Sequence, residues 1–208
     1  LTEPLEGSAA GMVRRVAEDP PALILVDLAA GASAAHRAIQ VLKTSSATRR
    51  VPIVAFGPHV ESESLALARG AGADRVVTRG QLQSSLVEIL RREARPPDVP
   101  AIEEACRQPA SDRAREGLAR LNAGAYFEAH ERLERAVLDD PGVGGTVYRT
   151  LLHLAVACLH TERGNWRGAQ KMVLRMQPWL ASLPERCRGV NVADLRREPR
   201  SILQLSGA

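Results

Sequence analysis

The first half of the chain alternates short apolar runs with segments in which apolar residues recur at helical spacing. The apolar runs occupy residues 23–27, 51–56 and 75–77. The helical segments that follow them occupy residues 33–42, 62–69 and 82–92. The runs are apolar at nearly every position, which is typical of strands buried on both faces. We therefore predict a parallel sheet whose strands are joined by helical crossovers.

The second half is helical throughout. Ser111 and Asp112 are N-cap residues for a first helix that ends at Gly124. Three further helices are predicted over residues 126–138, 146–162 and 166–177, and Pro178 is expected to kink or end the last of them. The helix over residues 146–162 is apolar on nearly every side, so it should be the most buried one.

A proline-rich stretch lies between the two halves. Residues 95–110 begin with Arg-Pro-Pro-Asp-Val-Pro, and proline removes amide donors and favours an extended chain. We predict an α/β domain over residues 1–94, a linker over 95–110 and a helical domain over 111–200.

The helical half contains an internal echo. Gly124-x-Tyr126-x-x-Ala129 recurs as Gly164-x-Trp166-x-x-Ala169. Each copy places a glycine at a turn, an aromatic residue in the first helical turn and a small residue where helices cross. Helical hairpins of tetratricopeptide arrays stack in this manner, although two copies do not make a solenoid.

Composition narrows the function classes. The chain is 45% hydrophobic and 25% charged, as expected for a globular protein, and no apolar tract is long enough for a membrane span. Its net charge of +4 is spread without a basic block, which argues against a nucleic-acid partner. The cytoplasm is the expected location. The partner of such a chain is expected to be a protein, and a homodimer stays open.

The cysteines and the C-terminal arginines suggest little chemistry of their own. Three cysteines, an odd number without a C-x-x-C spacing, predict reduced thiols rather than a disulfide framework. Aromatic residues are few, and we expect them to anchor the helical core. The expected solvated basic face comprises Arg186, Arg188, Arg196, Arg197 and Arg200.

The strongest chemical motif is the run His130-Glu131-x-x-Glu134. His130 and Glu134 stand at i and i+4 and so share a helix face, while His153 and His160 share a face of a later helix. If the two faces meet, the four side chains could bind a divalent transition metal, with Glu131 as the base of a metal-dependent hydrolase.

A structural interpretation of the same residues competes with the metal site. Polar groups on helices are costly to bury alone, and they are usually satisfied by hydrogen bonds. His130, Glu131 and Glu134 could form a polar clasp with His160 and Asn165 across the bundle. A pocket for an organic ligand is a third interpretation.

The first half resembles the later part of a response-regulator receiver domain over residues 22–92. The resemblance is carried by the strand that ends in Asp27, by Val51-Pro-Ile-Val-Ala-Phe56 and by Ala68-x-Gly70-Ala-Gly-Ala-Asp74. It implies a flavodoxin-like fold and places Asp27 at the phosphoacceptor position, at the carboxyl end of a strand.

The chain departs from the receiver pattern at the residues that act in phosphorylation. No acidic pair for Mg²⁺ precedes Asp27, Gly57 replaces the hydroxyl residue, and Arg79 replaces the lysine. The first two strands of the fold are not recognised, which would leave the strand of Asp27 as a sheet edge open to pairing. We expect a pseudo-receiver.

The second half resembles the bacterial helical family known as domain of unknown function 309 over residues 113–197. The motifs are Leu121-Asn122-x-Gly124-x-Tyr126-Phe127-Glu128-Ala129-His130-Glu131-x-Leu133-Glu134, then Arg163-Gly164-Asn165-x-x-Gly168-Ala169 and Gly189-Val190-Asn191-Val192. Val137 and His153 depart from the residues usual in the family. The resemblance implies a helical fold and no particular activity.

Three functions follow from these patterns. The favoured one is a non-catalytic signalling, regulatory or scaffold protein, with a pseudo-receiver joined to an antiparallel helical bundle of tetratricopeptide-like hairpins. The alternative is a metal-dependent hydrolase that uses His130, Glu131, Glu134 and His160. A weaker alternative is a phosphorelay receiver with Asp27 as acceptor.

Overall fold

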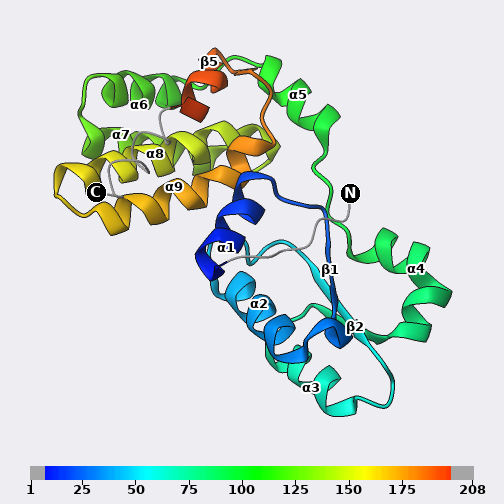
Figure 1. The fold of residues 1–208 in the computed structure, drawn as a ribbon. Coiled ribbons are helices and arrows are strands. Elements are labelled where there is room, and N and C mark those ends of the chain that lie inside the picture. Colours follow the sequence, from blue (N-terminus) through cyan, green and yellow to red (C-terminus); the bar gives the residue numbers. More distant parts are fainter. Residues whose placement is uncertain (1–7, 198–208) are drawn as a thin grey trace. The chain divides into compact units, whose positions relative to one another are not determined.

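The computed structural model describes residues 8–197 and divides the chain into two compact units between Pro97 and Asp98. The first unit is α/β and the second is almost entirely helical (Figure 1). No helix in the described range is long and apolar enough to cross a membrane.

The first unit is a three-stranded parallel sheet with helices on both faces. Its elements are α1 (Ala9–Glu18), β1 (Ile24–Asp27), the short 3-10 helix η1 (Leu28–Ala30), α2 (Ala32–Thr44), β2 (Ile53–Gly57), α3 (Ser62–Gly70), β3 (Arg75–Thr78) and α4 (Arg79–Glu93). The strand order is β1-β2-β3, which confirms the predicted parallel α/β pattern.

The apolar run in β2 is explained by burial on both of its faces. Ile53 and Ala55 pack into the cluster formed with α1, α2 and α3, whereas Val54 packs with β3 and α4. All three side chains are fully buried. Within the described residues β1 pairs with β2 alone, and Leu25 on this outer strand is 43% exposed.

The second unit is built from stacked helices with a small hairpin at its C-terminal side. Its elements are α5 (Val99–Arg107), α6 (Asp112–Asn122), α7 (Tyr126–Asp139), the 3-10 helix η2 (Val143–Gly145), α8 (Thr146–Glu162), α9 (Trp166–Ala181), β4 (Arg186–Cys187) and β5 (Val190–Asn191). The predicted bounds of α8 are confirmed. Tyr148, Leu151 and Ala155 place α8 in the core.

The helix α5 lies inside the stretch that was expected to be a linker. Asp98 caps it by accepting a hydrogen bond from the amide of Ala101, and Pro100 falls in the first turn, where a missing amide donor costs nothing. Ile102 and Cys106 are buried in the core of the second unit. That unit therefore begins before residue 111.

Two helices extend beyond their predicted ends. The helix α4 starts at Arg79 rather than at residue 82, because Thr78 and Gln81 form a capping box. The helix α9 continues past Pro178 to Ala181, since buried Leu180 holds its last turn in the core. The packing of Leu180 thus outweighs the cost of the backbone hydrogen bond that Pro178 cannot donate.

The two copies of the sequence echo adopt the same turn. Gly124 and Gly164 have φ of 75° and 66°, the left-handed region that glycine tolerates best. The amide of Ala125 donates to the carbonyl oxygen of Arg120 at 3.0 Å, and the amide of Asn165 donates to that of His160 at 2.8 Å. Ala129 and Ala169 are fully buried, as expected for helix crossing points.

Candidate functional site

The structure does not bring the predicted metal ligands together. Among the described residues, no group of three or more histidine, cysteine, aspartate or glutamate side chains is placed where it could hold a metal ion. Glu131 and Glu134 on α7 are exposed, and His130 is half-buried. The ring of His153 contacts its own helix, with Nδ1 2.6 Å from the carbonyl oxygen of Arg149.

Only one part of the predicted polar clasp is present. The side-chain oxygen of Asn165 accepts a hydrogen bond from the amide of Gly168 at 2.9 Å and so caps α9. Its amide nitrogen lies 3.2 Å from Nδ1 of His160. An amide NH₂ can only donate, so Nδ1 of His160 is the acceptor in this contact.

This contact joins neighbouring helices rather than crossing the bundle. His160 lies in the last turn of α8, and Asn165 precedes the first residue of α9. Within the described part of the chain, no hydrogen bond links His130, Glu131 or Glu134 to either residue. The pair therefore lies at the α8–α9 turn.

Two aromatic residues beside the echo turns lie on the surface instead of in the core. Phe127 at the start of α7 is 54% exposed, and Trp166 at the start of α9 is 41% exposed. The expectation that the aromatic residues anchor the helical core is wrong for these two, whereas Tyr126 and Trp179 are half-buried and Tyr148 is buried. The turns before α7 and α9 lie at the same end of the helical stack, so Phe127 and Trp166 share that end (Figure 1).

In the first unit, Asp27 is engaged by an arginine. Nη2 of Arg79 lies 2.9 Å from Oδ1 and 2.8 Å from Oδ2 of Asp27, and the amide of Ala29 donates to Oδ1 at 3.0 Å. The guanidinium also lies 5.5 Å from the centroid of the Phe56 ring. Arg79 therefore neutralises the carboxylate at the carboxyl end of β1.

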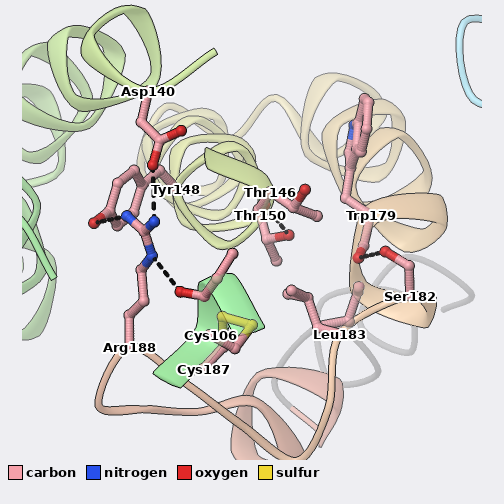
Figure 2. Close-up of a disulfide and its surroundings, with 12 residues drawn as sticks. Cys106, Asp140, Thr146, Tyr148, Thr150, Trp179, Ser182, Leu183, Cys187 and Arg188 are labelled. Atoms are coloured by element: carbon pink, nitrogen blue, oxygen red, sulfur yellow. Dashed lines mark hydrogen bonds and ion pairs between the residues drawn. A yellow bond between two sulfur atoms is a disulfide. The ribbon is translucent and has the colours of Figure 1, made fainter. Parts of the chain in front are cut away.

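The sequence did not predict the most connected polar site, which surrounds Arg188. The side chain is only 10% exposed and forms an ion pair with Asp140 at 2.9 Å. Nη1 donates to the hydroxyl oxygen of Tyr148 at 2.6 Å, and Nε donates to the carbonyl oxygen of Ala105 at 3.1 Å. Figure 2 shows the guanidinium between Asp140 and Tyr148.

The backbone turn between β4 and β5 places Arg188 beside Asp140 and Tyr148. Arg188 and Gly189 form the two-residue turn between β4 and β5, and their φ values are 51° and 81°. Two positive φ values are typical of the tight turns that join antiparallel strands. The expectation of a solvated arginine face is therefore wrong for Arg188, and Arg200 lies outside the described residues.

A disulfide lies next to this network and corrects the expectation of reduced thiols. Cys106 at the end of α5 is bonded to Cys187 in β4 (Figure 2), and Cys158 is not part of a disulfide. The two half-cystines are far apart in the sequence, with no spacing motif between them. Only the packing of α5 against the hairpin could have revealed the pair.

A cavity of about 520 Å³ opens beside the disulfide. Tyr148, Leu151 and Val190 form part of its wall, and Cys106 and Arg188 also line it. Cys106 is 9% exposed, whereas Cys187 is 1% exposed and is not among the lining residues. Cys106 is therefore the half-cystine on the cavity side, and Cys187 lies in the core.

Comparison with known families supports the assignment of the helical unit. The family described as "Domain of unknown function (DUF309)" matches residues 114–172, which include α7, α8 and most of α6. His130, Glu131, Glu134 and Asn165 lie within the match. No curated protein and no solved structure matches the chain.

Proposed function

We propose that the protein is a non-catalytic regulatory or scaffold protein. Its first unit is a receiver-like, flavodoxin-like domain that has lost phosphorylation switching. Its second unit is a stack of tetratricopeptide-like hairpins that binds a partner protein. The observation that carries the proposal is the ion pair between Asp27 and Arg79.

The environment of Asp27 disfavours phosphoryl transfer. A phosphoacceptor carboxylate must present a free oxygen to the phosphorus atom, and Mg²⁺ must neutralise the transferred charge. Both oxygens of Asp27 accept from Arg79, and Oδ1 also accepts from Ala29. No group of three acidic or histidine side chains that could hold a metal lies in the described residues.

The exposed aromatic residues supply the partner surface. Large apolar side chains at the surface mark binding sites when they gather in one region. Phe127 and Trp166 lie at one end of the helical stack, beside the turns of the two echo copies. Aromatic residues are also enriched at the energetic centres of protein interfaces.

A phosphodonor assay tests the loss of switching. The full chain is incubated with acetyl phosphate and Mg²⁺, and its intact mass is compared with that of Asp27→Ala. We expect each protein to keep its own unmodified mass, without a phosphorylated species. A mass gain of one phosphoryl group that disappears in Asp27→Ala would contradict the proposal and favour a phosphorelay receiver.

Site-specific photocrosslinking in cells tests the partner surface. A photoreactive residue is placed at position 127 or 166, and the matched control is position 138, where Leu138 is 73% exposed on the last turn of α7. We expect one discrete protein adduct shared by positions 127 and 166 and absent at 138. Equal labelling at all three positions would contradict a surface centred on Phe127 and Trp166.

A further inference from the structure

The disulfide fixes the segment that leads into the second unit. The helix α5 follows the boundary between the units, and Cys106 in its last turn is bonded to Cys187 of β4. The amide of Arg188 donates to the carbonyl oxygen of Cys106 at 2.8 Å. One covalent bond and a few hydrogen bonds thus hold α5 to the hairpin.

The two sulfur atoms differ in how a thiol from solution could reach them. Cys106 lines the cavity beside α5, while Cys187 is almost completely buried and does not line it. Exchange requires a thiolate to approach one sulfur of the disulfide directly. Since Cys106 is the half-cystine that lines the cavity, we expect its sulfur to be attacked and Cys187 to be the leaving group.

We propose that Cys106–Cys187 is a reversible thiol–disulfide exchange site for a small thiol of the glutathione class. The proposal does not depend on the function proposed above. Disulfides that a thiol can reach are the ones that exchange readily and take regulatory roles, and Cys106 lies on the wall of the cavity.

The exchange proceeds in two balanced steps. The attacking thiolate forms a bond to Sγ of Cys106, the Cys106–Cys187 bond breaks, and Sγ of Cys187 leaves with the electron pair and takes up a proton. The first step leaves a mixed disulfide between Cys106 and the small thiol, and a second thiolate then attacks the small-molecule sulfur of that bond. It releases the oxidised small-molecule disulfide, and Cys106 becomes a thiol.

Breaking the bond loosens α5. It then keeps the buried side chain of Ile102, its packing against η2 and the hydrogen bonds from Arg188 to the carbonyl oxygens of Ala105 and Cys106. A nine-residue helix at the margin of the unit opens more readily than the central helices once a covalent bond is removed. The redox state of Cys106 therefore controls the order of the segment that connects the units.

A glutathione titration tests reversibility. The full chain carrying Cys158→Ser, which removes the cysteine outside the disulfide, is equilibrated at a series of [GSH]²/[GSSG] ratios without denaturant and then alkylated. We expect the reduced fraction to rise from a tenth to nine tenths over about an 80-fold change in that ratio, as a two-electron couple requires. A disulfide that stays closed in fully reduced glutathione would overturn the proposal.

Trapping tests which sulfur is attacked. In the Cys158→Ser background, Cys187→Ser leaves Cys106 alone and Cys106→Ser leaves Cys187 alone, so each is the matched control for the other. With oxidised glutathione under native conditions, we expect a mixed disulfide on Cys106 at least about tenfold faster than on Cys187. Equal rates would contradict selection by the cavity.

Hydrogen exchange tests the conformational consequence on the chain with its cysteines intact. After reduction, we expect the amides of residues 99–107 to exchange about tenfold faster or more, while those of α8 change little. Unchanged protection of α5 would show that the bond does not control this segment. This measurement needs no variant that might fail to fold.

Discussion

The guanidinium of Arg188 donates a hydrogen bond to the hydroxyl oxygen of Tyr148 and lies 5.0 Å from the centroid of the same ring. The Tyr148 oxygen also accepts from the amide of Ser111, at 3.0 Å. Tyr148 thus connects the hairpin turn to the residue that caps α6. Three segments distant in the sequence meet at one buried side chain.

Arg188→Asn should destabilise the second unit by about 2 kcal/mol. The substitution keeps a residue that tolerates positive φ, but it leaves Asp140 and Tyr148 without the guanidinium. The ion pair is only partly buried, so its loss costs less than that of a fully buried pair. Urea unfolding followed by tryptophan fluorescence measures the change, because both tryptophans, Trp166 and Trp179, lie in this unit.

The control for this prediction is Arg186→Ala, since Arg186 is exposed on the adjacent strand. Its effect should stay within about 0.5 kcal/mol. A loss below about 1 kcal/mol in Arg188→Asn would mean that the network contributes little to stability.

The sequence predicts elements whose pattern is local and misses those that depend on distant contacts. The helix α8 is predicted to the residue, since its apolar pattern begins after a glycine turn and ends at Gly164. The helix α5 is missed because its prolines also suit an extended linker. Only the burial of Ile102 and Cys106 distinguishes the two.

In the candidate site, too, the sequence reveals local motifs and misses contacts between distant residues. The motif of His130 and Glu134 is visible in the sequence, yet their side chains lie apart from the contact between His160 and Asn165. The sequence does not indicate that the side chain of Arg188 is buried, because nothing local distinguishes Arg188 from its exposed neighbours. Its burial follows from the tight turn and the disulfide, which form only in the folded unit.

Gly117→Ala should destabilise the second unit by about 1–3 kcal/mol, although alanine favours helices. A Cβ at Gly117 would lie 2.8 Å from Cγ of Leu133, a fully buried residue of α7. Overpacking of this kind outweighs the gain of about 1 kcal/mol in helix propensity. Tryptophan fluorescence during urea unfolding again reports the change.

Gly142→Ala provides the comparison for this substitution. Its new Cβ would meet only Oδ1 of Asp140, at an ordinary 3.7 Å, and Gly142 has negative φ. We expect a change within about 0.5 kcal/mol. If both alanine variants unfold at the same urea concentration, close packing of α6 on α7 does not limit stability.

The role of Asn165 can be divided by two substitutions. Asn165→Ala removes both the cap of α9 and the donor to His160, and loss of an N-cap costs about 1 kcal/mol. Asn165→Asp keeps an oxygen for the Gly168 amide but removes the donor. We expect Asn165→Asp to lose less than about 0.5 kcal/mol, because a carboxylate caps a helix as well as an amide does.

Gly168→Ala tests the same cap from the other side of the hydrogen bond. Its Cβ would lie 2.7 Å from Nδ2 of Asn165 and 2.8 Å from Nδ1 of His160. This close approach explains why glycine occupies the position: a larger residue would push the cap away from the helix. We therefore expect Gly168→Ala to match Asn165→Ala in stability. If Asn165→Asp were as unstable as either, the hydrogen bond to His160 rather than the cap would hold the α8–α9 turn.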